Sequence, residues 1–208
     1  MNLVLLGAPG SGKGTQSEFI EKEFDVVQVS TGNLFRDNVK RKTPLGLEAE
    51  KYMNEGNLVP DKVVENMLAD KLNELASKNQ GFMLDGFPRT LKQAEFLHNY
   101  MKNAGLNLDH VLYLSVPDEE IIKRLSKRMT CKSCGKIHNQ DYKVCPECGG
   151  ELYKRDDDNE ETIKKRLNVF HENNSELLKF YSEKGLLIEI KALGNIDDIF
   201  AEIKRKLI

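Results

Sequence analysis

The amino-acid sequence predicts an α/β fold in which a parallel sheet is flanked by helices, and three observations support this. Residues 3–6 form a short, unbroken apolar run, as expected of a strand buried on both faces in a parallel sheet. Similar short runs recur at 26–29, 82–84, 110–116 and 186–190, separated by stretches with helical spacing. The chain of 208 residues is long enough for one well-buried core with small insertions. We therefore expect one main domain.

A glycine-rich loop follows the first apolar run and leads directly into a polar, helix-compatible stretch. The spacing Gly7-x4-Gly12-Lys13 fits the phosphate-loop pattern, in which backbone N–H groups, a lysine and a helix N-terminus converge on a polyphosphate. The loop departs from the general pattern because Gly14 separates the lysine from Thr15. An ordinary glycine-rich turn is the alternative. We predict a nucleotide phosphate site made by Gly10, Ser11, Gly12, Lys13, Gly14 and Thr15.

The balance of charge argues against a nucleic-acid or membrane partner. The chain has 31 basic and 33 acidic residues and a formal net charge of -2, so no overall positive field attracts a polyanion. The first apolar run is far too short to span a membrane and lacks the charged start and cleavage site of a signal peptide. We therefore expect a cytoplasmic protein whose anion site is local.

The segment 30–59 is predicted to form a small helical insertion between two core elements. Residues 30–33 offer an N-cap for one helix, and a second short helix ends at Gly56, a residue suited to the position after a helix. Residues 57–59 then run extended, because the proline that follows disfavours a helical conformation before it. Asp61 is predicted to cap the next helix, which is long and amphipathic.

Two later elements are expected to deliver charged side chains to the site. The run 82–84 ends in Asp85, and such a strand places its last residue at the carboxyl edge of a parallel sheet, where a carboxylate can hold Mg²⁺ directly or through water. After the next strand, a helix over 118–128 is expected to carry Arg124 and Arg128 on one face, because they are four residues apart.

Four cysteines within a short segment form the second strong motif of the chain. Cys131-x2-Cys134 and Cys145-x2-Cys148 each precede a glycine, which permits the tight turn around a metal ion. In a reducing compartment this spacing favours metal ligands over disulfides. Zinc held by four thiolates has no open coordination position, so we expect one structural zinc; iron and an unmetallated redox pair are the alternatives. His138 lies nearby, but four cysteines already complete a ligand set.

Five segments, in the same order, resemble the nucleoside monophosphate kinases, and the adenylate kinase family in particular, over essentially the whole chain. They are the phosphate loop with its extra glycine, STG followed by Arg36, DGFPRT followed by Gln93, the cysteine segment, and RDDD followed by Arg166. The resemblance implies reversible transfer of the γ-phosphoryl group of MgATP to AMP, giving two ADP, by a monomer. It implies a core of residues 1–29, 60–126 and 159–208, an AMP-binding insertion over 30–59, and a zinc-binding lid over 127–158.

The resemblance also implies roles for individual residues. The cations expected to act on the transferring phosphates are Lys13, Arg36, Arg89, Arg128, Arg155 and Arg166. Besides the loop residues 10–15, those expected at ATP are Arg124, Arg128, Ile137, His138 and Gly194. Those expected at AMP are Thr31, Arg36, Asn57, Leu58, Val59, Gly86, Phe87, Pro88, Arg89, Gln93, Arg155 and Arg166. Asp85 would hold magnesium through water, and Gln93 would read the adenine edge, because an amide can donate and accept together.

Three other functions remain as alternatives. The nearest is a kinase for UMP or CMP, or one that uses GTP, although Gln93 and the cysteine segment favour adenine nucleotides. A non-catalytic nucleotide sensor would have no need of the STG and DGFPRT segments. A zinc ribbon that binds nucleic acid would need a clustered basic surface, whereas Asp141, Glu147 and Glu151 balance the lysines of this segment.

Overall fold

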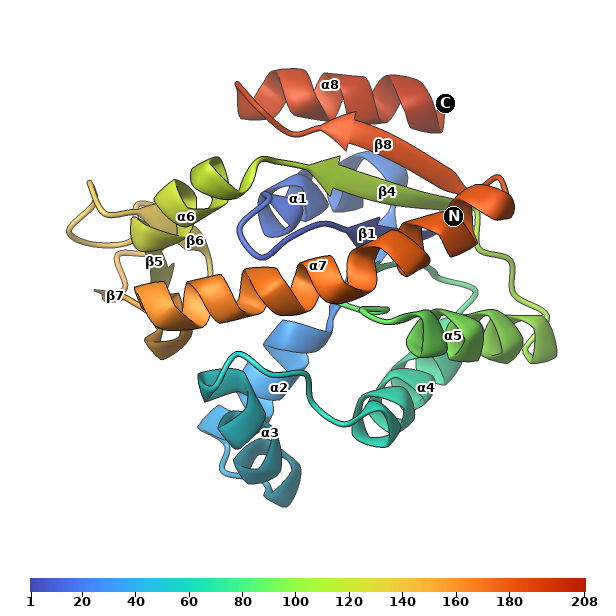
Figure 1. Ribbon diagram of the computed structural model, residues 1–208, viewed down its shortest axis with the longest axis horizontal. Coiled ribbons are helices and arrows are strands. Elements are labelled where there is room, and N and C mark those ends of the chain that lie inside the picture. Colours follow the sequence, from blue (N-terminus) through green and yellow to red (C-terminus); the bar gives the residue numbers. More distant parts are fainter.

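The computed structural model describes residues 1–208 and confirms the predicted α/β fold (Figure 1). The central sheet has five strands in the order β2-β3-β1-β4-β8, and every neighbouring pair is parallel. The strands are β1 Asn2–Leu6, β2 Val26–Ser30, β3 Gly81–Asp85, β4 His110–Ser115 and β8 Leu187–Lys191. Because β1 lies in the middle, the loop that follows it emerges at the centre of the carboxyl edge, where ligands bind in open α/β sheets.

Helices cover both faces of this sheet. On one face lie α1 Lys13–Phe24 and α8 Ile196–Leu207; on the other lie α4 Asp61–Ser77, α5 Leu91–Asn103 and α7 Glu160–Glu183. The side chains of β1 alternate between two cores, with Leu3 and Leu5 in the cluster that contains α1 and α8, and Val4 and Leu6 in the other. All four are almost fully buried, which explains why this strand reads as a continuous apolar run.

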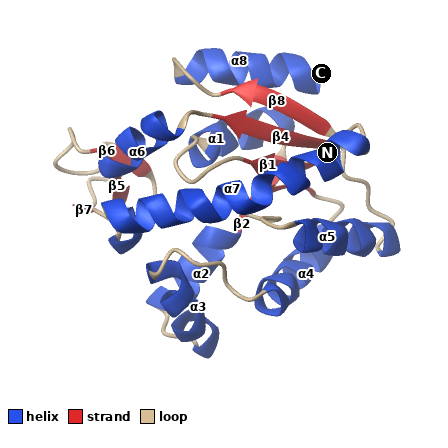
Figure 2. Cartoon of the chain, in the orientation of Figure 1, coloured by secondary structure: helices blue, strands red, loops and turns tan.

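Two smaller groups of elements extend from the sheet at its carboxyl edge (Figure 2). One is the helix pair α2 Thr31–Lys40 and α3 Pro44–Asn54. The other follows α6 Asp118–Ser126 and is a three-stranded antiparallel sheet in the order β6-β5-β7. Its strands are β5 Arg128–Cys131, β6 Ile137–Asn139 and β7 Leu152–Tyr153, and a single 3-10 turn, η1 Asp156–Asp158, leads back to α7.

The expectation that Arg124 and Arg128 share one helix face is wrong. Helix α6 ends at Ser126, and Arg128 is the first residue of β5, where it pairs with Asn139. The ladder between β5 and β6 supplies backbone hydrogen bonds that a longer helix would forfeit. The two arginines therefore reach the site from different elements.

Asp61 also differs from expectation, because it is the first residue of α4 and not its cap. Pro60 occupies the cap position, and no side chain caps this helix. A carboxylate in the first turn still favours the helix through its dipole. The oxygens of Asp61 instead contact α5, where Oδ1 accepts a hydrogen bond from Gln93 and Oδ2 lies 3.3 Å from Nζ of Lys92.

Helices α2 and α3 pack so closely that Gly46 has no room for a side chain. A Cβ at this position would overlap the backbone carbonyl of Asn38. We predict that Gly46→Ala forces the two helices apart and lowers the free energy of unfolding by about 1–3 kcal/mol, the usual cost of overpacking. Urea denaturation followed by circular dichroism measures this change.

The matched control for this prediction is Leu47→Ala, at a neighbouring position that is 49% exposed. It should change the free energy of unfolding by about 0.5 kcal/mol or less. Equal stability of Gly46→Ala and the wild type would contradict the tight packing of the two helices.

Candidate active site

The glycine-rich loop joins β1 to α1 and has the geometry of an anion cradle. Gly7, Gly10 and Gly12 have positive φ angles of 147°, 85° and 98°, which residues other than glycine rarely adopt. Gly12 is the N-cap of α1, and no side chain caps the helix. The N–H groups of its first turn are therefore free to bind an anion, and the helix dipole adds to their attraction.

Lys13 lies across this loop. Its Nζ donates hydrogen bonds to the carbonyl oxygens of Gly7 at 2.7 Å and Ala8 at 2.9 Å. The buried hydroxyl of Ser11 has no hydrogen-bond partner within the chain. A phosphate in the cradle would offer acceptors both to the ammonium and to this hydroxyl.

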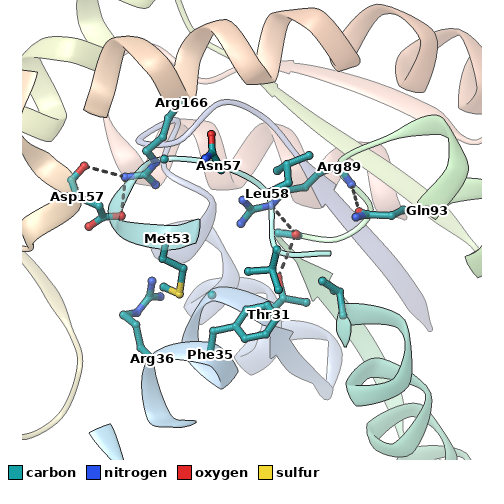
Figure 3. Close-up of a pocket in the computed structure, with 15 residues that line it drawn as sticks. Thr31, Phe35, Arg36, Met53, Asn57, Leu58, Arg89, Gln93, Asp157 and Arg166 are labelled. Carbon is teal, nitrogen blue, oxygen red and sulfur yellow. Dashed lines mark hydrogen bonds and ion pairs between the residues drawn. The ribbon is translucent and has the colours of Figure 1, made fainter. Parts of the chain in front are cut away.

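A cavity opens between the sheet edge and the α2–α3 pair (Figure 3). Nine of the residues expected at AMP line it, namely Thr31, Arg36, Asn57, Leu58, Val59, Gly86, Arg89, Gln93 and Arg166. Figure 3 shows Arg36 and Gln93 on opposite sides of this space, with Arg166 above it. The carbonyl of Gly86 accepts hydrogen bonds from Thr31 Oγ1 at 3.0 Å and Arg89 Nε at 2.8 Å, so a single carbonyl fixes two of the lining side chains.

Three residues expected at AMP do not line the cavity. Phe87 is fully buried in the core, Pro88 follows it, and Arg155 donates from Nε to the hydroxyl of Thr130 on β5 at 2.9 Å. Other lining residues were not among those expected at AMP, namely Gly32, Phe35, Met53, Gly56, Val64 and Asp157. Phe35 and Met53 come from α2 and α3 and give the cavity apolar walls. The signal for Phe35 was its position four residues after Thr31, on the same helix face.

The arginines of the site are held by acidic partners from η1. Arg128 makes a two-point contact with Asp158, from Nε at 2.7 Å and Nη2 at 2.5 Å, and both side chains are almost fully buried. Arg166 donates from Nη1 to Asp157 at 2.7 Å and lies 3.6 Å from Asp158. Hydrogen bonds to two charged oxygens in fixed geometry make such a pair strong and directional.

The cations lie close enough to perturb one another. Burial lowers the pKa of Lys13 to about 8, and while Asp85 raises this pKa, Arg89, Arg166 and Arg128 lower it. Burial likewise lowers the pKa of Arg89 to about 10 and that of Arg155 to about 9, so both remain charged at neutral pH. The pKa of Arg36 is lowered by burial, although Asp157 raises it. The region thus concentrates positive charge in a poorly solvated space, which favours polyanions.

Two of the remaining residues expected at ATP, Arg124 and Ile137, lie beside the loop. Arg124 lies beside Gly12 and donates from Nη2 to the carbonyl of Ala192 at 3.2 Å, close to Gly194 in the loop after β8. Ile137 on β6 lies against the position of Gly14. His138 lies elsewhere, with Nε2 at 3.2 Å from Sγ of Cys145. Asp85 ends β3 as expected, and its Oδ2 accepts from Gln28 at 3.3 Å.

The four cysteines form one cluster whose sulfur atoms all lie within 4.8 Å of one another. Two of the separations are 3.5 Å, from Cys131 to Cys148, and 3.6 Å, from Cys134 to Cys145. A tetrahedral ion with bonds of about 2.3 Å to sulfur requires separations of about 3.8 Å. Gly135 and Gly149 have positive φ, as the predicted metal turns require. The cluster can therefore hold a metal ion.

Comparisons with known proteins find similar sequences that carry the name adenylate kinase. A family model described as adenylate kinase matches residues 5–186. A protein of Caldicellulosiruptor bescii named adenylate kinase is 46% identical, over 100% of this chain and 99% of its own. Adenylate kinases of Thermodesulfovibrio yellowstonii and Archaeoglobus fulgidus are 48% and 41% identical, over 98% of this chain and 97% and 96% of theirs.

No helix is both long and apolar enough to cross a membrane.

The lowered pKa of Lys13 predicts that anion binding is coupled to proton uptake. A bound polyanion favours the charged ammonium, so it raises this pKa from about 8 in the free protein. Above that pH, inorganic triphosphate should therefore bind with uptake of a proton, and its affinity should fall as the pH rises further.

Calorimetry in two buffers of different ionisation enthalpy measures the proton uptake. Lys13→Met is the control and should bind without it. If the wild type binds triphosphate with no uptake in this range, Lys13 is not the group that titrates.

Proposed function

This chain belongs to the adenylate kinase family and has adenylate kinase function, and from this premise we propose that it transfers the γ-phosphoryl group of MgATP to AMP. The reaction gives two ADP and is reversible. We further propose that the chain acts as a cytoplasmic monomer whose ligands are ATP, AMP and ADP.

The observation that carries this proposal is the cavity beside α2 and α3. Cationic side chains of Arg36, Arg89 and Arg166 face it, and Gln93 reaches it from α5 with both a donor and an acceptor. Phe35 and Met53 provide apolar walls. A nucleoside monophosphate combines an anionic phosphate with a flat base, so this arrangement suits it at both ends. We propose that AMP binds here, with its phosphate at the arginines and its adenine edge at Gln93.

The glycine-rich loop is the proposed site of the ATP phosphates. Lys13 would leave the carbonyls of Gly7 and Ala8 for a phosphate oxygen, which is a stronger acceptor because it is charged. Arg124 lies between this loop and the carbonyl of Ala192, so the donor adenine would stack near Arg124 and Gly194. Magnesium, when bound, would neutralise phosphate charge, and Asp85 is the carboxylate in position to hold its water ligands.

Transfer of the phosphoryl group requires alignment and charge stabilisation more than a dedicated base. In addition to burial, Arg89, Arg128 and Arg166 each lower the pKa of Lys13, so the four cations lie near one another. We propose that the donor and acceptor phosphates meet beside these cations. Arg36 and Arg155 lie near the same cations and would add to their field. We propose that residues 30–59 and 127–158 close over the substrates, and that closure excludes water as a competing acceptor.

Zinc is the metal we propose for the four cysteines, because thiolates with tetrahedral spacing suit it and leave no open position for catalysis. The ion would hold the segment 127–158 together. This segment contributes only Thr130, Cys131, Cys145 and Asp158 to the buried residues of the protein, so it has little core of its own. Metal binding would supply the stability that burial does not.

The experiment that tests the proposed function follows nucleoside diphosphate formed from MgATP and a panel of AMP, GMP, CMP and UMP. We expect AMP to be strongly preferred. Lys13→Met should lower turnover by several orders of magnitude, because it removes a charge from the transition state and leaves the fold intact. A preference for another monophosphate would leave the phosphate chemistry in place but overturn the acceptor assignment, and no transfer to any of them would favour a nucleotide sensor.

A separate prediction concerns the metal. Cys131→Ser should lower zinc content well below one per chain and lower the melting temperature, because three thiolates hold the ion less tightly than four. Metal analysis and calorimetry measure the two effects. His138→Gln is the control and should retain one zinc, since four cysteines complete the set. Unchanged zinc in Cys131→Ser would exclude this cysteine as a ligand.

A further inference from the structure

We propose that Asp61 is a positioning residue that fixes the amide of Gln93 in one orientation and thereby selects adenine over a 6-oxopurine in the acceptor site. The inference rests on the proposed function, in which Gln93 reads the base. It concerns a residue that lies behind the amide and does not line the cavity.

The amide of Gln93 has two partners within the chain, one for each polar atom. Oε1 accepts a hydrogen bond of 2.7 Å from the backbone N–H of Arg89, which Figure 3 shows. Nε2 donates a hydrogen bond of 2.7 Å to Oδ1 of Asp61. The side chain of Gln93 is therefore held at both ends, and the residue is only 2% exposed although it lines the cavity.

The chemistry of these partners determines which end of the amide is which. A backbone N–H can only donate, so the atom facing Arg89 must be the oxygen. An ionised carboxylate can only accept, so the atom facing Asp61 must be the nitrogen. Rotation of the amide by half a turn would place two donors against each other at Arg89 and two acceptors against each other at Asp61. Both contacts thus favour the same orientation.

After these two contacts, the amide keeps one N–H donor and one lone pair on its oxygen for a ligand. Adenine presents an exocyclic amine, which donates, beside the ring nitrogen N1, which accepts. Hypoxanthine presents the reverse pattern, with a carbonyl oxygen beside a protonated N1. A freely rotating amide pairs with either base, whereas a fixed amide pairs with only one. Fixing the amide therefore converts a contact that tolerates both bases into one that rejects the wrong base.

The environment of Asp61 suits this role. Its second oxygen lies 3.3 Å from the ammonium of Lys92, a side chain that is 77% exposed, and the carboxylate is 26% exposed. Since Pro60 occupies the cap position and no side-chain cap is made, the oxygens of Asp61 are not used to cap α4. The contact joins α4 to α5 behind the base-reading edge, so it positions the amide without touching the substrate.

The test compares AMP with IMP as acceptors for the wild type and for Asp61→Asn. The asparagine amide can donate or accept, so it no longer distinguishes the two orientations of Gln93. Loss of a charged group that can only accept removes the energy difference between the two orientations at this contact, and its size implies that the ratio of kcat/KM for AMP to that for IMP falls by about tenfold to a hundredfold. The KM for AMP should rise while the KM for IMP falls, and kcat should change little for either.

The opposite movement of the two KM values separates positioning from structure, because general loosening of the site would raise both. Glu65→Gln is the matched control: it makes the same change of carboxylate to amide one turn along α4, and the AMP to IMP ratio should stay at the wild-type value. If Asp61→Asn keeps the wild-type ratio, or raises both KM values together, the inference fails while the kinase assignment stands. If the wild type itself does not prefer AMP, the proposed acceptor site fails first.

Discussion

Electrostatic repulsion among the cations at the carboxyl edge of the sheet is the constraint on which the rest of the structure depends. Burial lowers the pKa of Lys13, and Arg89, Arg128 and Arg166 lie close enough to lower it further. Like charges that are poorly solvated repel strongly, so this arrangement is tolerated only with compensating anions. In the free protein the compensation comes from Asp85, Asp157 and Asp158.

The placement of these three carboxylates follows from their segments. Asp85 is fixed to the sheet because it ends β3, whereas Asp157 and Asp158 belong to the short turn η1 between the antiparallel sheet and α7. The pair of Arg128 and Asp158 therefore ties the start of β5 to the turn by which the chain returns. Removing one partner of such a buried pair costs about 3–5 kcal/mol, because the other charge is left unpaired. A phosphate can take the place of a carboxylate without leaving an arginine unpaired.

The sequence predicts best those parts of the site whose chemistry is local. The phosphate loop is predictable because its glycines, its lysine and the start of α1 are adjacent in the chain, and the cysteine cluster because two short turns carry its ligands. The end of α6 was mispredicted, since Arg128 continues the helical pattern and only its pairing with Asn139 shows that it belongs to a strand. Phe35 and Met53 were not singled out, because apolar residues on helices usually serve the core. The spacing from Thr31 was a local signal for Phe35, whereas only the fold brings Met53 to the cavity.

Asp61 shows most clearly what a sequence cannot reveal about a site. An aspartate at the start of a helix reads as a cap, which is a local role, but its partners here are Gln93 and Lys92, on another helix. Nothing within a few residues of Asp61 points to that contact, since the chain reaches α5 only after passing through β3. The position of Asp61 away from the base is also what suits it to a positioning role. A residue that touches the base must match its shape, whereas a residue behind the amide can set the direction of a hydrogen bond without taking space from the ligand. Specificity for the base then depends on an acceptor and a donor, Asp61 and the N–H of Arg89, that the substrate need never contact.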